Sequence, residues 1–429
     1  MSGKFIQILS DGTSRSIEID FSFNGYNEKK ARKKVALCIR NKLDFIDSYF
    51  SVLRQGNIPI VLNANLTQKK CIEVATKLEA HFLWIGQDKI SLKYDDDFIS
   101  TLGHILCTSG TTSLENRPKS YFFSLRKPVE NSIAHQESLS DLTAKRVLFP
   151  LSLYHSFGVV VGLWSTVVKN LETFFYENEF TPKQIFDTLR KEQIEILYLT
   201  PSLARQLIKF SKRYKKKIVA PRIVSVGSSL FKSHEMASLQ KIFTNSRLFY
   251  TYGLTEMGPR VSTYLYQDSH QEELLPLGIF LAKTEYKINK TLYIKSEYCA
   301  DEFENTFFNT HDFVLNYNND LYIQGRDDDV IISQGINIFA HEVEALVRGY
   351  DDVEDCALVA ENSTLFGQIP VLFIQGKIQK ELLIRFLEED LPLTHLPKKV
   401  LYIASLPKTE LGKIKKKVLI QLASENIGG

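Results

Sequence analysis

The densest group of small polar side chains lies between Leu106 and Lys119, in the segment LCTSGTTSLENRPK. After an apolar run come five consecutive small residues: Thr108, Ser109, Gly110, Thr111 and Thr112. Hydroxyls and backbone N–H groups at this density suit the oxygens of a polyphosphate, and Lys119 could add a positive charge. A solvated Ser/Thr loop explains the segment alone equally well. The GxxxxGK[ST] pattern is absent, so ordinary P-loop chemistry is not implied.

Two further polar loops follow predicted strands. In Tyr250–Gly258, YTYGLTEMG, Tyr252 offers a flat face to a base, Thr255 a hydroxyl and Glu256 a hard oxygen ligand for Mg²⁺. The segment Val226–Ser229 also follows a strand end. Ligands of open α/β sheets bind beyond the carboxyl ends of the strands, so two loops at one edge predict a ligand site. The alternatives are core packing for Tyr252 and a solvent-facing carboxylate for Glu256.

Three polar segments occur later in the chain. Thr310–Asp312 and Gly325–Asp329 supply an Asp and an Arg that could hold ribose hydroxyls. The three adjacent Asp residues could instead form a calcium-type or solvated cluster, but no EF-hand spacing follows them. Leu406–Lys417, LPKTELGKIKKK, could alone be a basic, solvated tail.

Composition narrows the class of protein. The 429 residues are 44% hydrophobic and 24% charged, with a formal net charge of +3, which is typical of soluble globular proteins of two to four domains. This balance does not favour binding to nucleic acid or membranes. The five cysteines form no CxxC motif, so we expect reduced thiols, a cytoplasmic location and no metal or redox site of that kind. The start of the chain lacks the pattern of a signal peptide.

The predicted elements alternate between strands and helices. Residues 39–53 have helical periodicity and Gly56 can end that helix, Ile58–Leu62 is a strand, and Thr67 can cap a second helix. Further segments continue the alternation, namely strands at 82–85, 194–199, 222–226 and 247–251 and helices starting at 182 and 201. This order predicts an α/β fold with mixed or parallel sheets covered by helices. The uncharged stretch Val147–Val168 is read as a buried strand, a polar loop and a buried helix, without a membrane span.

The composition changes at Asp327. From there a unit of about a hundred residues carries its own strand and helices, which is a plausible small α+β domain. We therefore expect a large domain over residues 1–326 and a small one over residues 327–429.

Taken in this order, the segments resemble the adenylate-forming superfamily of acyl- and aryl-CoA synthetases, peptide-synthetase adenylation domains and luciferases. TSGTT is similar to the phosphate loop of that family and YGLTE to its adenine and Mg²⁺ loop. GRDDDVIISQGINIFAHEVE is similar to its hinge signature and PKTELGKI to its terminal lysine motif. The resemblance runs from about Ile39 to the end, and the chain is short for the family, so we expect a trimmed N-terminal subdomain.

The resemblance implies two half-reactions and a role for each motif. A carboxylate attacks the α-phosphorus of ATP and releases pyrophosphate, and a thiol then displaces AMP to give a thioester. Lys413 would be the catalytic lysine, Glu256 the Mg²⁺ ligand, Asp328 the hinge of a mobile lid domain and Gly335 part of the thiol entrance. The phosphates of ATP would contact Thr108–Thr112 and Lys119, and the ribose would contact Asp312 and Arg326. The adenine would lie in a slot formed by Gly227, Ser228, Ser229, Tyr252, Gly253 and Thr255.

Two details bear on the substrate and on activity. His155, in LYHSFG, resembles a gate beside the acyl pocket, or it is a core histidine. Residues 151–158 contain no Asp, which disfavours an α-amino acid and leaves a fatty or an aryl acid. The family pattern has Gly where this chain has Ser113, and three extra residues precede Pro118, so the role of Lys119 is open.

The thiol that accepts the acyl group is not settled by the sequence, and two other classes of protein remain possible. The thiol could be coenzyme A or the phosphopantetheine of an acyl carrier protein, whose phosphates or acidic face could meet Lys212–Lys217 or Lys413–Lys417. A non-catalytic, nucleotide-binding relative is supported by Ser113 alone, and a nucleic-acid-binding protein by the lysine clusters alone.

Overall fold

A computed structural model describes residues 1–22, 32–92, 99–107, 119–141, 143–214, 221–270, 272–333, 336–350, 352–363, 367–408 and 414–425. The chain divides into two compact units. The large unit contains residues 1–286 and 294–308, and the small unit contains residues 287–293 and 309–429.

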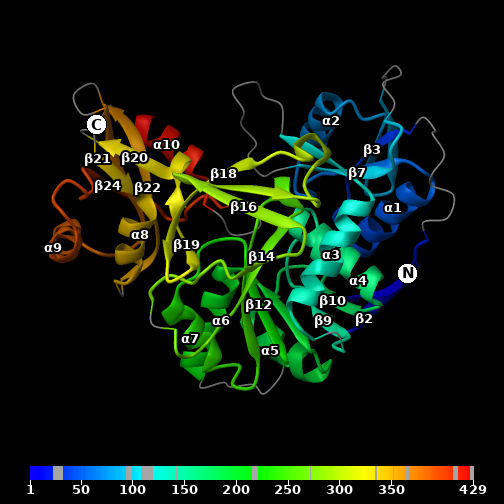
Figure 1. The fold of residues 1–429 in the computed structure, drawn as a ribbon, viewed down its shortest axis with the longest axis horizontal. Helices are drawn as coiled ribbons and strands as arrows, with labels where there is room; N and C mark the ends of the chain where they lie inside the picture. Colours follow the sequence, from blue (N-terminus) through cyan, green and yellow to red (C-terminus); the bar gives the residue numbers. More distant parts are fainter. Residues whose placement is uncertain are drawn as a thin grey trace. The chain divides into compact units, whose positions relative to one another are not determined.

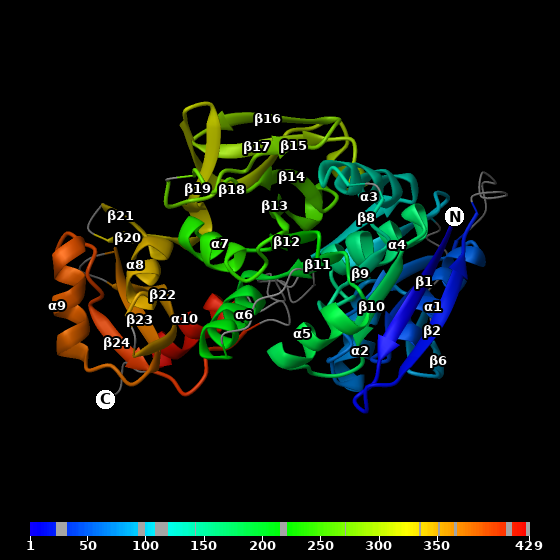
Figure 2. The same ribbon diagram turned by 90° about the horizontal axis from the view of Figure 1, so that it is seen from below.

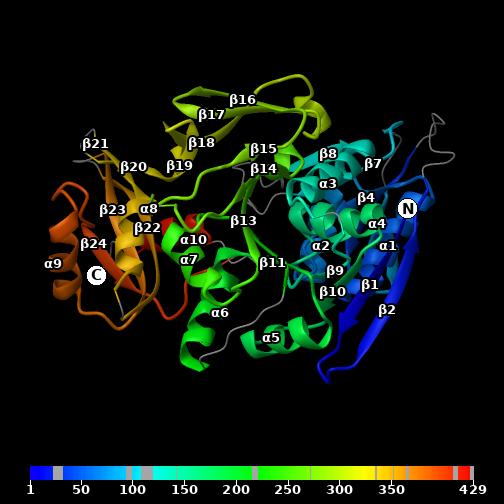
Figure 3. The ribbon, with the colours of Figure 1, turned by 60° about the horizontal axis from the view of Figure 1, so that its bottom comes forward.

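The largest sheet carries the loops of interest at one edge. Its order is β15 (Ile279–Phe280), β14 (Arg260–Leu265), β13 (Arg247–Gly253), β12 (Ile223–Gly227), β11 (Ile196–Leu199), β9 (Arg146–Leu148), β10 (Glu172–Tyr176), β1 (Ser2–Ile8) and β2 (Ser14–Asp20). From β1 to β13 each neighbouring pair is parallel, and the outer pairs are antiparallel (Figure 3). The carboxyl ends of β12 and β13 therefore lie side by side.

The helices of this sheet fall into two groups. α5 (Pro182–Lys191), α6 (Pro201–Tyr214) and α7 (Ser233–Gln240) lie next to one another, and α6 packs on β12 (Figure 2). α3 (Arg126–Ser138), the π-helix η1 (Gly158–Trp164) and α4 (Ser165–Lys169) form the other group, and α3 packs on β14. Thr181 caps α5 with a capping box followed by Pro182, as the sequence predicted.

A second sheet precedes the phosphate-loop motif. Its order is β6 (Asp88–Ser91), β5 (Phe82–Ile85), β3 (Lys34–Cys38), β4 (Ile58–Val61), β7 (Gly103–Cys107) and β8 (Ser120–Ser124). α1 (Lys42–Arg54) packs against strands of both sheets, and α2 (Gln68–Lys77) packs on β5 (Figure 1). Gly56 has a φ of +75° just after α1, and the Thr67 side chain caps α2, so both predicted helix boundaries are confirmed.

Four further strands form a sheet in the order β16 (Thr284–Asn289), β17 (Thr291–Ser296), β18 (Phe308–Tyr317) and β19 (Asp320–Arg326). Short 3₁₀ turns at three places flank the motifs, namely η2 (Thr255–Met257), η3 (Asp301–Phe303) and η4 (Asp327–Asp329).

The small unit packs helices on both faces of one sheet. Its elements are β20 (Val330–Ser333), β21 (Ile336–Phe339), α8 (Ala340–Arg348), β22 (Val353–Ser363), β23 (Gly367–Gly376), α9 (Lys380–Asp390), β24 (Lys399–Tyr402) and α10 (Lys416–Glu425). Along β22, Cys356 and Leu358 pack with α8 and α9, whereas Ala357 and Val359 pack with α10. This period of two buries both faces of the sheet, and Figure 2 shows α9 and α10 on its opposite sides.

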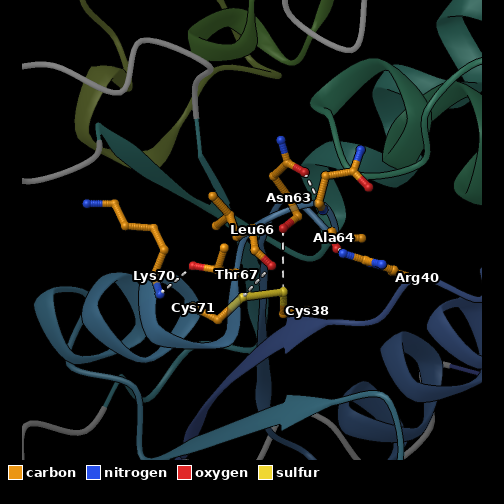
Figure 4. Close-up of a disulfide and its surroundings, with 9 residues drawn as sticks. Cys38, Arg40, Asn63, Ala64, Leu66, Thr67, Lys70 and Cys71 are labelled. Carbon is orange, nitrogen blue, oxygen red and sulfur yellow. Dashed lines mark hydrogen bonds between the residues drawn. A yellow bond between two sulfur atoms is a disulfide. The ribbon is translucent and has the colours of Figure 1, made fainter.

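Two features of the fold were not predicted from the sequence. Residues 1–40 show little periodicity, yet β1 and β2 lie in the large sheet, where β1 pairs with β10 and β2 and buries Phe5, Ile6 and Gln7 while Lys4 is exposed. Cys38, at the end of β3, and Cys71, in α2, are joined in a disulfide with a Cα–Cα separation of 6.8 Å (Figure 4). The expectation of reduced thiols is therefore wrong for this pair. The strand and the helix bring together two residues that are 33 apart in sequence.

The predicted domains, residues 1–326 and 327–429, are drawn by function, and the compact units divide the chain differently, with residues 287–293 and 309–326 in the small unit. The predicted boundary and its hinge at Asp328 stay predictions. The stretch 147–168 holds a strand end, turns and the buried helices η1 and α4, as predicted. No helix in the described ranges is long and apolar enough to cross a membrane.

Candidate active site

The adenine-slot candidates lie on neighbouring strands. Gly227, the last residue of β12, is paired with Thr251 of β13. A Cβ atom at Gly227 would lie 2.8 Å from the Thr251 carbonyl oxygen, so only glycine permits this approach of the two strands. The next residue, Ser228, has a φ of +94°, and the Tyr250 hydroxyl donates to the Ser229 carbonyl oxygen at 3.4 Å. The turn after β12 is thus held against β13.

The YGLTE loop leaves the same edge of the sheet. Tyr252 and Gly253 end β13 and are partly exposed. A Cβ atom at Gly253 would lie 3.0 Å from the Pro259 carbonyl carbon, so the loop closes on itself at this glycine. Thr255 and Glu256 then form η2, where both side chains are partly exposed.

A hydrogen bond joins this loop to the segment that contains His155. The Ser156 and Thr255 hydroxyl oxygens lie 2.9 Å apart. His155 is partly buried, and its carbonyl oxygen accepts from the Val159 N–H as η1 begins. Two motifs whose contacting residues are 99 positions apart in sequence therefore meet in the structure.

Glu256 lies in an acidic, hydroxyl-bearing environment. Burial raises the pKa of the Tyr121 hydroxyl, and the nearby Glu256 carboxylate raises it further. Partial burial and the charge of Glu256 also raise the pKa of Glu302. Among the described residues no group of three or more His, Cys, Asp and Glu side chains is placed to hold a metal ion, so Glu256 as a Mg²⁺ ligand stays a prediction.

The ribose candidates are paired in the small unit. Asp312 and Arg326 are directly opposite on β18 and β19, and Arg326 Nη1 lies 3.3 Å from Asp312 Oδ1. Asp312 is buried and Arg326 is exposed. Arg326 Nη1 also donates to the Thr310 carbonyl oxygen at 3.2 Å, which fixes the guanidinium beside the carboxylate. The structure thus brings together the two residues that the sequence assigned to one task.

Several predicted site residues lie outside the described residues, namely Thr108–Thr112, Gly335 and Lys413, as do Ser113 and Pro118. Lys119 is exposed directly before β8, which pairs with β7 on the other side of the motif. Asp328 lies in η4, between β19 and β20.

The segment that carries Lys413 is closed at its base. Lys408 and Ile414 form a β-bridge, and the Lys415 N–H donates to the Pro407 carbonyl oxygen at 2.8 Å. Lys416 Nζ follows this base and lies 3.0 Å from Glu344 Oε1. We call these contacts the neck of the lysine loop.

Sequence reasoning did not single out Tyr121, Ser156, Glu302 or Glu344. Ser156 follows His155, Tyr121 lies two residues after Lys119, and Glu344 is the last residue of the hinge signature, but their residue types carried no separate signal. Glu302 lies in no motif that would mark it.

Comparisons with known proteins agree with these motifs. Residues 100–292 match the AMP-binding enzyme family, and residues 342–413 match the AMP-binding enzyme C-terminal domain. A protein of Staphylococcus epidermidis named "Putative long chain fatty acid-CoA ligase VraA" is 24% identical, over 91% of this chain and 88% of that protein. The 2-succinylbenzoate–CoA ligase of Lactococcus lactis is also 24% identical, over 90% of each chain.

The fold has the same relatives. The o-succinylbenzoate CoA synthetase (MenE) of Bacillus subtilis, solved with its acyl-adenylate intermediate, superposes with a TM-score of 0.77 at 18% identity, over 90% of this chain and 88% of that one.

The chain belongs to the AMP-binding enzymes, the adenylate-forming superfamily that its motifs predicted. The predicted fold class is confirmed, and so is the prediction of an AMP-forming ligase of the acyl-CoA synthetase type.

Proposed function

We propose that the protein activates a fatty or aryl carboxylic acid as an acyl-adenylate and transfers the acyl group to the thiol of coenzyme A. The observation that carries this proposal is the Ser156–Thr255 contact, at 2.9 Å, which holds the His155 segment against the Glu256 loop. In this arrangement a nucleotide loop and a candidate acid gate lie together in a chain of the AMP-binding family.

The first step must overcome charge repulsion. The carboxylate approaches a polyphosphate, and a pair of like charges about 4 Å apart costs about 4 kcal/mol at an effective dielectric near 20. Glu256, supported by Glu302, would hold Mg²⁺, which neutralises phosphate charge when bound. We assign the hydroxyls of Thr108–Thr112 to the phosphates and Lys413 to the attacking carboxylate and the ribose oxygens.

The nucleotide would be held by the remaining predicted residues. Tyr252 offers its ring to the adenine, and the turn Gly227–Ser229 offers backbone groups and hydroxyls to the same base. In the small unit, the Asp312 carboxylate accepts and the Arg326 guanidinium donates hydrogen bonds, which fits ribose hydroxyls. Lys119, being exposed, remains a candidate for the phosphates.

In the second step the thiol sulfur attacks the acyl carbon, the carbon–oxygen bond to AMP breaks, and the thiol proton goes to solvent or base. Gly335 is proposed to line the thiol entrance. His155 is proposed to gate the acid pocket beside the Glu256 loop. Coenzyme A is our choice of acceptor because both curated relatives are named CoA ligases. A carrier-protein phosphopantetheine is the alternative.

The test is ATP–pyrophosphate exchange over a panel of fatty, aryl and amino acids, followed by thioester formation with coenzyme A or a pantetheinylated carrier protein. We expect exchange with a fatty or aryl acid and thioester with coenzyme A. Nucleotide binding without exchange for any acid would favour a non-catalytic relative. Exchange with amino acids alone would contradict the assignment of the acid.

A further inference from the structure

Arg260 is a buried arginine in the first position of β14, directly after the Glu256 loop. Its exposed fraction is 4%, although a charged side chain is almost never fully buried unless it is paired. Two hydrogen bonds with Asn131 of α3 hold its backbone: the Arg260 N–H donates to Asn131 Oδ1 at 3.0 Å, and Asn131 Nδ2 donates to the Arg260 carbonyl oxygen at 2.8 Å. β14 pairs Arg260 with Gly253, so the residue is fixed from both sides.

The guanidinium has donors without acceptors. Nε and Nη2 of Arg260 are covered and make no hydrogen bond, and no carboxylate among the described residues pairs with them. The guanidinium carbon lies 5.2 Å from the centre of the Phe157 ring, which contributes a cation–π contact. Burial lowers the pKa of Arg260 to about 10, so the group stays charged at neutral pH.

The titratable groups around this cation are neutral. Burial raises the pKa of Tyr198, which keeps its hydroxyl protonated. Burial and the charge of Arg260 lower the pKa of His135 well below its ordinary value, which keeps the imidazole uncharged. His135 Nε2 lies 3.1 Å from the Tyr198 hydroxyl oxygen, and His135 Nδ1 is buried without a partner. Two neighbouring side chains therefore present unmatched nitrogen atoms.

A buried charge without a partner is strongly unfavourable, and proteins normally pair it or replace it with an apolar residue. Here the cation lies one short step along the chain from the Glu256 loop and next to Phe157, which follows the Ser156–Thr255 contact. An anion that arrives with the substrate would match the unpaired donors. We propose that the acid substrate carries a second anionic group, a distal carboxylate, which binds Arg260, with His135 beside it.

The surroundings favour an organic acid over a phosphate as the source of this anion. The rings of Phe149, Phe157 and Tyr198 pack against one another, with centroids 5.6 to 6.0 Å apart, and form a buried aromatic cluster beside Arg260. An acid with an apolar carbon skeleton matches these rings better than a free phosphate does. The inference rests on the proposed acid activation, for which it names the substrate class.

The test uses acids in matched pairs that differ only in the second carboxylate: hexanedioate with hexanoate, octanedioate with octanoate, and terephthalate with p-toluate. We expect the wild-type enzyme to exchange pyrophosphate at least about 100-fold more efficiently with the diacid of a pair, because the site is built to pair a charge. In Arg260→Met this preference should collapse to near unity, chiefly through KM for the diacid. Arg260→Lys should keep part of it, since a cation remains.

The outcomes separate this inference from the proposed function. No exchange with any acid would reject the proposed function itself. Exchange in which mono-acids equal or exceed the diacids, or an unchanged ratio in Arg260→Met, would overturn the second anion and leave acid activation standing. Replacing an unpaired buried ion by methionine should leave Tm unchanged or raise it. A fall in Tm of more than about 5 °C in both Arg260 variants would assign the guanidinium to the fold and overturn the inference.

Discussion

Replacing Lys416 by methionine should slow acid adenylation and leave thioester formation from supplied acyl-adenylate nearly unchanged. The Lys416 Nζ atom lies 3.0 Å from Glu344 Oε1 and 3.4 Å from Asp329 Oδ2, and the Glu344 side chain is only 8% exposed. Burial alone would lower the pKa of Lys416, but the two carboxylates raise it above its ordinary value, so the lysine is charged. The ion pairs of Lys416 with Glu344 and Asp329 therefore stabilise the neck of the lysine loop.

The magnitude follows from this geometry. Two opposite charges about 4 Å apart attract each other by about 4 kcal/mol at an effective dielectric near 20. After the cost of desolvating Lys416 and its carboxylate partners, we take the net contribution as about 2 kcal/mol. At 1.4 kcal/mol per factor of ten, loss of the anchor lowers the population of the held loop by up to about 30-fold. Glu344 keeps Arg348 at 3.3 Å, so the variant does not leave a buried carboxylate alone.

Single-turnover measurements of each half-reaction check this expectation. Adenylation, which we assign to Lys413, should fall by about 10- to 30-fold, while conversion of supplied acyl-adenylate should stay within about twofold. Lys415→Met is the matched control, since it removes the same charge from the exposed preceding residue. The reasoning is refuted if the two lysine variants behave alike, or if the Lys416 variant depresses both half-reactions equally.

Three other changes test separate parts of the site and fold. Glu256→Ala should cut pyrophosphate exchange by at least about 100-fold at limiting Mg²⁺, because a hard cation loses its oxygen ligand; wild-type exchange there would sink the assignment. His155→Ala should change acid preference or thioester yield; a large drop in Tm with normal kinetics would identify a core histidine instead. Burial lowers the pKa of His104 from 6.5 to about 3, so the unfolded chain binds a proton that the folded chain excludes. His104 should therefore lower the free energy of unfolding as pH drops from about 6.5, by up to about 1.4 kcal/mol per pH unit, and His104→Asn should remove that contribution from the slope in urea titrations.

Local chemistry explains which elements were predictable from the sequence. Thr67 and Thr181 cap their helices with their own side chains, so both helix starts are encoded in a few adjacent residues. β1 had no such signal, because its few apolar residues show no regular alternation and its place depends on its neighbours β2 and β10. The Cys38–Cys71 contact likewise depends on where a strand and a helix converge.

The same distinction between local motifs and tertiary contacts applies to the residues of the candidate site. Tyr252 and Glu256 could be proposed from the sequence because the loop motif is continuous, and Asp312 and Arg326, which the structure pairs, because each lies in a short motif. Ser156 and Glu302 were not found, since their positions depend on tertiary contacts that no local pattern encodes. Arg260 is the clearest case. Next to a motif it looks like an ordinary strand residue, and only its burial without a partner marks it.

The proposed active site must serve an anionic attack on phosphorus and then a thiol attack on carbon. Lys413 is assigned to the first step, and Gly335, nearer to η4 in the sequence, to the second. Between the two half-reactions the small domain is predicted to turn about Asp328, which lies in the short η4 between β19 and β20. Proline fixes φ near about −65° and removes a backbone donor, so Asp328→Pro should restrict the hinge. We expect this variant to form acyl-adenylate but to lose at least about tenfold in thioester formation, whereas Lys413→Ala should block adenylation by at least about 100-fold yet convert supplied acyl-adenylate. Single-turnover assays of both steps decide the matter, with Asp327→Ala as the control that keeps the backbone free to rotate. If Asp328→Pro and Lys413→Ala lower the two steps in equal proportion, the chain does not divide its chemistry between two arrangements of the small domain.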